Sequence, residues 1–593
     1  MNSDAISQKY NGLLQTLLSE RNSEGFWSGR LSTSALATAV GIVALKVAGS
    51  SADRHRTDDG FAWLCRNINS DGGFGDTSDS LSNVSTTLLC YAAVSYCQTG
   101  DNGLATLKAM EKWLSEKGIT IDSGSVTGSI LKFYGSDYTF SLPILSMLIL
   151  CEVIPASSIE KIPRLPFELT LLPSSFYRFL NLRVVSYALP ALIGVGIYLH
   201  RNRKKGFLRR GVIRDRFVKP SVNKLTGLVP ASGGFLEAIP LTGFVSMCLI
   251  ASGESDNIIV SKGLEFLRVQ QRDDGGWPID TDLSTWVTTL SVKALGGQIS
   301  QALTNDEIEK LRNHLLNLQY TTRHPFNDAK PGGWGWTSYS GSVPDADDTP
   351  GAILALLEMY SGSQEEIIAI ENGCNWLIDL QNNDGGFPTF CRGWGKLPFD
   401  RSCADLTGHA LLALLKTAEK LNRDISPLIL AKIDRSILKA TVYLTKHQSD
   451  DGSWLPLWFG NQFTGDKTNP VYGTAKVGIY LSDCLAFQRP ERELINRLTR
   501  LVNKARVYLL TQQNADGSWG GGTGVPGTIE ETSLAVSALV AGHNEACGRG
   551  VKWLGKQEKI TSSPIGLYFA LLWYDEKMYP LIYYTEALRR FLR

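Results

Sequence analysis

Short apolar stretches alternate with glycine-containing turns along most of the chain, and this pattern predicts helices joined by tight turns. In "STWVTTLSVKAL" (284–295) and "ETSLAVSALV" (531–540), small and apolar residues predominate, as expected for buried helices. The first 25 residues are polar and predict an amphipathic helix, not a secretory signal peptide. No apolar run reaches the roughly 18 residues that a membrane-spanning helix requires.

The turns between these helices repeat. Each full copy has an aromatic–Leu pair, then a glutamine, then Asp-Gly-x-aromatic, as in "KGLEFLRVQQRDDGGW" and "KARVYLLTQQNADGSW". The glutamines of the four full copies are Gln271, Gln381, Gln448 and Gln513. The unit of helix, turn and helix recurs every ~50–65 residues, which is within the range of helical repeat arrays. We expect the aspartate to cap the next helix, and the glutamine and aromatic residue to clamp neighbouring units.

Helix pairs of this kind must bury both faces, so they close into a ring or stack into a solenoid. The strongly apolar helices that follow the turns favour a ring whose inner wall they form. The fold class is therefore predicted to be all-α.

Bulk properties exclude several classes of function. The formal net charge of +1 argues against a dedicated nucleic-acid binder. The ten cysteines are scattered singly, which indicates reduced thiols in a cytoplasmic protein and neither a zinc site nor a disulfide scaffold.

The segment "SVPDADDTPGAILALL" is unusual because it places three carboxyl groups, those of Asp345, Asp347 and Asp348, directly before an apolar helix. Burying such a cluster carries a large desolvation cost. Thr349 is a plausible N-cap and Pro350 suits the first helical position, so we expect a helix to begin there. Either the segment is a solvated surface turn, or the protein needs a carboxylic acid inside an apolar cavity.

The repeat and the acidic motif together resemble the squalene–hopene and oxidosqualene cyclases. Four copies match the family's Gln-x-x-x-Gly-x-Trp repeat, one of them with Phe387 in place of Trp. The Asp-x-Asp-Asp-Thr motif stands in its wider family context, "PGGWGWTSYSGSVPDADDT". Protein prenyltransferase subunits are more weakly related, but their Asp-x-Cys zinc motif does not occur in this chain.

The resemblance implies two (α/α) barrels of helical repeats, one inserted in the other. Residues 1–20 would form an N-terminal helix that packs on the catalytic barrel. Residues 21–281 would form the inserted barrel with a membrane-contact segment, and residues 282–593 the catalytic barrel. The active-site cavity would lie between the two barrels.

The resemblance also implies roles for the acidic residues. Asp347 would be the proton donor to an alkene, and Asp345 and Asp348 would support it through hydrogen bonds. The family carries an Asp-x-Thr-x-His segment that corresponds to Asp405 and His409, four residues apart on one predicted helix face. A positively charged His409 would make the carboxyl proton more acidic, and Asp405 would keep His409 charged.

Carbocations formed after protonation need stabilisation by aromatic faces. Positions that match the family in this role are Trp286, Trp336, Phe390 and Trp458, with Phe399 as a further candidate. The alternative is that these rings only fill the core. No metal site and no cofactor are expected.

The substrate is expected to be squalene or a similar hydrophobic polyprene, and the product a polycyclic triterpene such as a hopanoid. The C-terminal region "SSPIGLYFALLWYDEKMYPLIYY" departs from the family's Gly-Thr-Gly-Phe-Pro segment, which leaves the product skeleton open. Two alternatives are a class II cyclase of a prenyl diphosphate and a non-catalytic helical-repeat protein that binds lipid.

A membrane surface is the expected partner, on the cytoplasmic side and without a spanning helix. The apolar segment Val184–Leu199, with Leu192 and Ile193 at its centre, precedes a basic run that includes Arg201, Arg203 and Lys204. The alternative is a buried core helix followed by a basic loop. Self-association into a homodimer is left open.

Overall fold

The glutamine of each repeat clamps its turn to the neighbouring unit. Gln381 Nε2 donates to Gly385 O in the turn (2.8 Å) and to Ser436 O in a helix packed alongside (3.0 Å). The same pair of bonds, to a turn glycine carbonyl and to a carbonyl of a neighbouring helix, is made by Gln271, Gln448 and Gln513. Since a buried carbonyl without a partner is costly, the predicted clamping role is confirmed.

The aspartate of each turn closes the turn itself. Asp384 Oδ1 accepts a hydrogen bond from Gly386 N at 3.0 Å, whereas the next helix, α18, begins only at Ala404. The expectation that the aspartate caps the next helix is therefore wrong. Gly385 has φ +94°, and a Cβ added there would lie 2.3 Å from Lys439 O, so the turn requires glycine.

A threonine on most of the inner helices provides a second tie. The backbone N–H of Trp519 donates to Thr532 Oγ1 at 3.0 Å, and that of Trp334 donates to Thr349 Oγ1 at 3.0 Å. Thr349 is therefore occupied by this tie and is not the N-cap that was expected. The N-cap is Asp347 and helix α16 begins at Asp348, two residues before the predicted first helical position Pro350.

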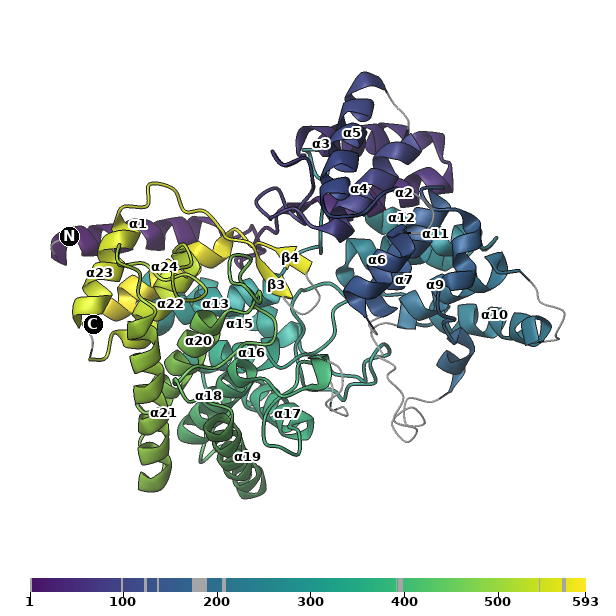
Figure 1. Cartoon of the computed structure of the whole chain (residues 1–593). Helices are drawn as coiled ribbons and strands as arrows, with labels where there is room; N and C mark the ends of the chain where they lie inside the picture. Colours follow the sequence, from purple (N-terminus) through teal and green to yellow (C-terminus); the bar gives the residue numbers. More distant parts are fainter. Residues whose placement is uncertain are drawn as a thin grey trace.

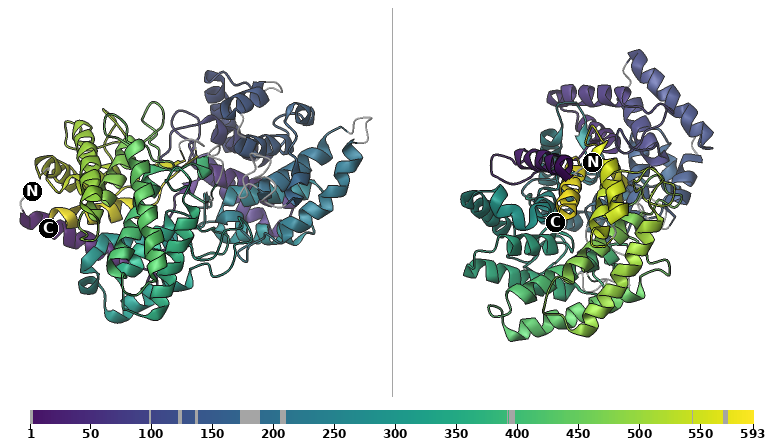
Figure 2. Two further views of the ribbon diagram at one scale, coloured as in Figure 1. Left: turned by 90° about the horizontal axis from the view of Figure 1, so that it is seen from below. Right: turned by 90° about the vertical axis from the view of Figure 1, so that its left-hand side faces the viewer.

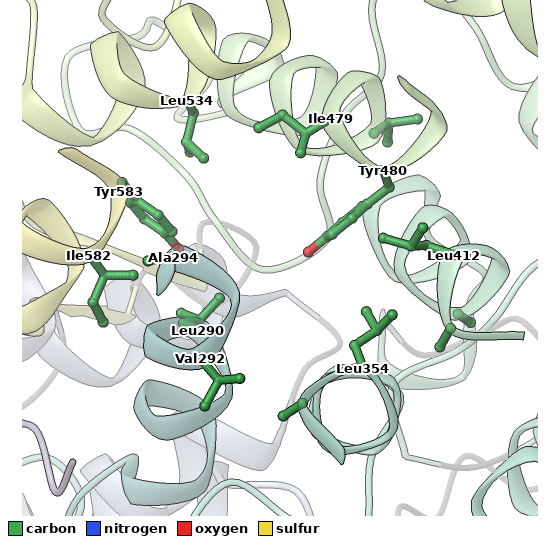
Figure 3. Packing of buried hydrophobic residues seen from close by; sticks show 14 of the residues in the cluster. Leu290, Val292, Ala294, Leu354, Leu412, Ile479, Tyr480, Leu534, Ile582 and Tyr583 are labelled. Atoms are coloured by element: carbon green, nitrogen blue, oxygen red, sulfur yellow. The ribbon is translucent and has the colours of Figure 1, made fainter. Parts of the chain in front are cut away.

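These ties join the helices into a closed ring (Figure 1), which we call the large lobe. Its inner helices contact one another in cyclic order and are α13 (Ser284–Leu295), α16 (Asp348–Glu358), α18 (Ala404–Lys420), α20 (Pro470–Cys484), α22 (Ile529–Leu539) and α24 (Met578–Phe591). Their apolar side chains meet in one core, as Figure 3 shows for Leu290, Leu354, Leu412, Ile479, Leu534 and Ile582.

The outer helices of the large lobe cover this ring. They are α1 (Ser3–Ser19), α15 (Asn305–Asn317), α17 (Gln364–Leu380), α19 (Pro427–Lys446), α21 (Arg492–Thr511) and α23 (Asn544–Gly555). Helix α1 packs on α24, so the first and last helices of the chain lie side by side (Figure 2). The N-terminal helix thus completes the outer layer at the point where the chain closes the ring.

A second ring, which we call the inserted lobe, has a separate hydrophobic core. Its inner helices, again in cyclic contact, are α2 (Ala35–Ala48), α4 (Val84–Cys97), α7 (Tyr138–Leu150), α9 (Leu189–Asn202) and α11 (Ile239–Ala251). The outer helices are α3 (Arg54–Arg66), α5 (Gly100–Glu116), α6 (Ser125–Tyr134), α10 (Arg210–Thr226) and α12 (Ile258–Gln270). The all-α prediction is confirmed.

This computed structural model describes residues 3–97, 100–121, 125–135, 138–172, 189–204, 210–390, 392, 398–542, 544–567 and 572–593. The remaining short elements are α14 (Ile299–Ala302) and the 3₁₀ helices η1 (Ser51–Asp53), η2 (Ala156–Lys161), η3 (Phe167–Leu171), η5 (Phe235–Glu237), η6 (Gly296–Gln298) and η7 (Pro398–Asp400).

The chain crosses between the lobes twice, and the two crossings are paired. Strand β1 (Thr33–Ser34) lies after α1 and pairs antiparallel with β2 (Trp277–Pro278), which lies just before α13. A hairpin of β3 (Ile565–Leu567) and β4 (Leu572–Tyr574) lies at the same junction (Figure 1). The boundaries after residues 20 and 281 remain predictions that agree with these crossings.

The expected membrane-contact segment is a core helix where the structure describes it. In α9, Ile193 is fully buried and Leu192 is partly buried, because the helix packs between α7 and α11. Arg201 pairs with Glu254 at 2.8 Å, and Arg203 donates to backbone carbonyls of the same lobe. Residues 184–188 lie outside the described residues. The α9 part of that prediction is wrong, since its apolar side chains are needed for the core.

Replacing Gln381 by alanine should lower the free energy of unfolding by about 1–3 kcal/mol, because two carbonyls lose their donor. Urea or thermal denaturation followed by circular dichroism measures this loss. Gln364→Ala, at the exposed first position of α17, is the matched control and should change little. Equal stability of the two variants would contradict the clamp.

Candidate active site

A cavity of about 390 Å³ lies between the two lobes and has almost entirely apolar walls. The inserted lobe contributes residues such as Leu36, Ile144 and Phe244, and the large lobe contributes Trp286 and Trp458. Among the described residues that line the cavity, those of a charged type are all aspartates. They are Asp76, Asp280, Asp345, Asp347 and Asp348. The acidic motif therefore faces an apolar cavity and is not a solvated surface turn.

The N-terminus of α16 positions the acidic motif. Asp345 Oδ1 accepts the backbone N–H groups of Asp347 and Asp348, both at 2.8 Å, so this carboxyl group caps the helix. The positive end of the helix dipole favours a negative charge at that point. Asp348 Oδ1 is fully buried and has no hydrogen-bond partner among the described residues. Asp345 thus orders the backbone that carries the next two carboxyl groups.

Asp347 is the carboxyl group of the motif that meets the predicted histidine. His409 Nδ1 on α18 lies 3.3 Å from Asp347 Oδ1. The imidazole stacks on the ring of Tyr480, with 4.7 Å between centroids, and it meets Trp286 edge to face, with 6.0 Å between centroids. The structure therefore brings Asp347 and His409 together as the sequence predicted, although their chemical roles remain predictions.

Asp405 lies close to this pair but is bonded elsewhere. Its Oδ1 accepts hydrogen bonds from Cys403 Sγ and from the backbone N–H of Leu406 at 3.1 Å. The expectation that Asp405 holds a proton on His409 is therefore wrong. The first turn of α18 uses this carboxylate as a local cap.

Burial governs the protonation states of the motif. It raises the pKa of Asp347, although the positive charge of Lys476 opposes that rise. It also raises the pKa of Asp348 well above its usual range, and repulsion from Asp345 adds to the effect. With its pKa raised to about 6, Asp347 keeps its proton to a higher pH than an aspartate in water does, as donation of a proton requires.

His409 is neutral, which contradicts the predicted positive charge. Burial lowers the pKa of His409 well below its usual value, and the charges of Lys476 and Lys293 lower it further. The sequence argument failed here because it could show neither the complete burial of the imidazole nor the two lysines next to it.

The predicted aromatic residues all line the cavity. Trp336, Phe390, Phe399 and Trp458 form one cluster, with neighbouring ring centroids 5.1 to 6.1 Å apart. Trp458 Nε1 donates to Thr389 Oγ1 at 3.0 Å, which fixes the orientation of its ring. Trp286 stands apart from this cluster, beside His409. Their presence in the cavity wall agrees with cation stabilisation, which remains a prediction.

Lys476 is the main residue of the site that sequence reasoning missed. It lies on α20, and only 2% of its surface is exposed. The signal was available, because "PVYGTAKVGIYLSDC" has a single lysine within an otherwise apolar and small-residue stretch of a predicted inner helix. Asp280, another cavity-lining carboxyl group, was also missed, and burial raises its pKa well above the usual range.

No group of three or more His, Cys, Asp or Glu side chains that could hold a metal ion occurs among the described residues. Likewise, no helix within the described ranges is long and apolar enough to cross a membrane.

Comparison with known families matches both lobes. Residues 283–563 match the squalene-hopene cyclase C-terminal domain, and residues 11–221 match the squalene-hopene cyclase N-terminal domain. The chain belongs to the squalene–hopene cyclase family. This family comprises class II terpene cyclases, and the two matched domains lie on the two lobes that enclose the cavity.

Individual relatives are distant. A terpene cyclase–glycosyl transferase fusion protein of Humicola fuscoatra is 28% identical over 358 residues, which are 53% of this chain and 25% of that protein. A squalene–hopene cyclase of Bradyrhizobium diazoefficiens is 28% identical over 295 residues, 45% of this chain and 42% of that protein. The chain thus aligns with less than half the length of these curated relatives.

Among solved structures, ent-copalyl diphosphate synthase from Streptomyces platensis superposes over 99% of both chains with a TM-score of 0.59. The two sequences are 16% identical, so this similarity establishes the fold of the squalene–hopene cyclase family member described here and nothing about its substrate.

Burial raises the pKa of Asp405 from 3.8 to about 6. The unfolded chain releases this proton near the lower value and the folded chain near the higher one, so stability falls as pH rises through this window. Asp405→Asn should therefore gain stability relative to wild type between about pH 4 and 7, by up to about 3 kcal/mol. Denaturation midpoints measured across this range test the expectation. Asp379→Asn, an exposed member of an ion pair with Lys330, should show no comparable trend.

Proposed function

We propose that this chain is a protonation-initiated cyclase that converts squalene or a similar uncharged polyprene into a polycyclic triterpene. One observation carries the proposal. The carboxyl group of Asp347 faces an apolar cavity, and a neutral histidine lies 3.3 Å from one of its oxygens. Such a group can hold a proton in the absence of water and deliver it to a weakly basic carbon–carbon double bond.

The first step follows from this geometry. The O–H bond of Asp347 breaks, the π electrons of a terminal double bond form a C–H bond, and a carbocation remains beside a carboxylate. Asp345 and Asp348 take no proton from the substrate in this scheme. Asp345 holds the backbone of the motif through two hydrogen bonds, and Asp348 keeps its own proton, because burial and the neighbouring carboxyl groups raise its pKa well above the usual range.

The cavity wall suits the cations that follow. Aromatic faces attract a cation without offering a nucleophile that would trap it, and each desolvated contact contributes about 2 kcal/mol. The cluster of Trp336, Phe390, Phe399 and Trp458 would stabilise later cations, and Trp286 the first one near Asp347. Each ring closure forms a carbon–carbon bond from the next double bond and moves the positive charge along the chain.

An uncharged substrate is favoured by the lining of the cavity. None of the described residues that line it is a lysine or an arginine, whereas five are aspartates. A diphosphate group in this space would meet mainly apolar surface and carboxyl groups, with no positive side chain among the described lining residues to balance its charge, at a large electrostatic cost. The rival, a cyclase of a prenyl diphosphate, draws support only from the shared fold with ent-copalyl diphosphate synthase.

Asp347→Asn should reduce cyclisation by at least about a hundredfold, because the amide keeps the shape of the side chain but cannot act as the acid. Purified protein is incubated in detergent micelles with squalene and, separately, with geranylgeranyl diphosphate, and the products are identified by mass spectrometry. Thermal denaturation confirms that the variant is folded. Near-normal turnover by the folded variant would remove Asp347 from the mechanism.

The same assay distinguishes the alternatives. Squalene turnover that survives EDTA supports the proposal. Turnover of geranylgeranyl diphosphate alone, lost in EDTA and restored by magnesium, supports the rival. Binding of squalene without any product, in wild type and variant alike, supports a non-catalytic lipid-binding protein.

A water-insoluble substrate also motivates peripheral binding to the cytoplasmic face of a membrane. Since α9 is buried, we place the contact on α10, where Ile213 and Phe217 are 52% and 38% exposed on one helix face. Arg216 and Lys219 are exposed on the same helix, as expected at an anionic lipid surface.

Replacing both Ile213 and Phe217 by glutamate should reduce the fraction of protein that floats with anionic lipid vesicles, because the apolar face is lost. Turnover in detergent micelles should not change. Leu428→Glu, at a 68% exposed position on the large lobe, is the control. If the double variant floats as well as wild type, α10 is not the contact.

A further inference from the structure

Lys476 is a buried lysine in an unusual environment. Its Nζ atom has no hydrogen-bond partner among the described residues and lies over four aromatic rings instead. The distances to the ring centroids are 5.4 Å for Trp286, 5.9 Å for Tyr472, 5.4 Å for Tyr480 and 5.4 Å for Tyr583. These rings, which we call the aromatic cage, come from α13, α20 and α24. Tyr480 and Tyr583 project into the barrel from opposite sides (Figure 3).

The cage stabilises a positive charge at this point. A desolvated ammonium group over an aromatic face gains about 2 kcal/mol per contact, which offsets part of its lost hydration. Lys476 is not among the residues that line the cavity, whereas Trp286 is. The ammonium group of Lys476 therefore lies behind the cavity wall. It does not occupy the space in which a cation formed from the substrate would lie.

Every element around the ammonium group contributes charged or titratable side chains. Its strongest electrostatic neighbours are Lys293 on α13, Asp347 at the N-cap of α16, Glu586 on α24 and Asp405 on α18. Glu586 is already committed, because it pairs with Lys293 at 3.2 Å and with Arg590 at 2.9 Å. On α22, Glu530 and Glu531 accept hydrogen bonds from Ser563, Asn461 and Asn469. Within the acidic motif, Asp347 is therefore the carboxyl group on which the charge of Lys476 acts directly.

We propose that Lys476 is a positioning residue for the acid, whose caged ammonium group stabilises the Asp347 carboxylate after its proton has left and keeps His409 neutral. This inference rests on the proposed function. The neutral His409 cannot itself supply the positive charge that was expected of it, and Lys476 supplies it instead. Burial already disfavours protonation of the imidazole, and the same ammonium group disfavours it further, so His409 contacts Asp347 as a neutral ring.

Two substitutions test the charge separately from the shape. Lys476→Met removes the charge and keeps an unbranched apolar chain, which a buried site tolerates. Lys476→Arg keeps the charge. Lys416→Met is the matched control, since Lys416 is a partly buried lysine on α18 that is paired with Glu358 at 2.7 Å and absent from the charges that act on Asp347.

The pH profile of turnover is the first measurement. Without the charge, Asp347 becomes a weaker acid, so Lys476→Met should lower maximal turnover by roughly 10- to 100-fold. The limb on which activity falls with rising pH should move up by about one pH unit, because Asp347 keeps its proton longer. Lys476→Arg should lose activity over the same pH range as wild type and should keep most of the turnover. Lys416→Met should match wild type in both respects. A purely structural role would lower activity without moving the limb.

The charge state of His409 is the second measurement, and it needs no substrate. Histidine-labelled protein, with His409→Asn for assignment, is titrated by NMR. The His409 signal should stay neutral in wild type through the pH range in which an ordinary histidine gains a proton, and it should gain a proton at higher pH in Lys476→Met than in wild type. The inference would be overturned if the folded Lys476→Met variant lost activity over the same pH range as wild type and if its His409 titration were unchanged. If wild type cyclises no polyprene, the proposed function fails, and the NMR titration alone then decides the role of Lys476.

Discussion

The exclusion of water from around the carboxyl group of Asp347 is the constraint on which the rest of this structure depends. A carboxylic acid in water gives its proton to water long before it reaches a double bond, so Asp347 must face an apolar space. That space is formed only where the two lobes meet, with walls from both of them. The cost of burying three adjacent aspartates is met locally, by the N–H groups at the start of α16 and by protonation.

Rigidity around this cavity comes from ties that repeat with the sequence. Each clamp glutamine joins a turn to a neighbouring helix, and each turn tryptophan or phenylalanine donates its backbone N–H to a threonine of an inner helix. The threonine of the acidic motif, Thr349, makes this same tie to Trp334. The helix that carries the acid is therefore held by the scaffold's own repeating bond, and its carboxyl groups are free for other contacts.

The charged groups around Asp347 lie on two sides of the cavity wall. Among the described residues that line the cavity, the charged types are all carboxyl groups, which suits an uncharged hydrocarbon. Behind the wall, Lys476 and Lys293 place positive charge close to Asp347 and His409, and the aromatic cage keeps Lys476 without a hydrogen bond. The separation lets the site use a cation for acidity while the reaction space itself contains none.

The sequence by itself determined the helical repeat, the all-α fold, and the acidic motif with its histidine and its aromatic residues, because these features depend on local spacing and on motifs that survive at low identity. Tertiary structure decided the rest. The burial of α9 follows from its packing between α7 and α11, although its apolar run was equally compatible with a lipid surface. The lowered pKa of His409 follows first from its burial and then from two lysines on other helices, Lys476 and Lys293, and no local pattern encodes either the burial or the proximity of the lysines. Electrostatic energy depends on distances through space, and only the closed ring of helices fixes those distances.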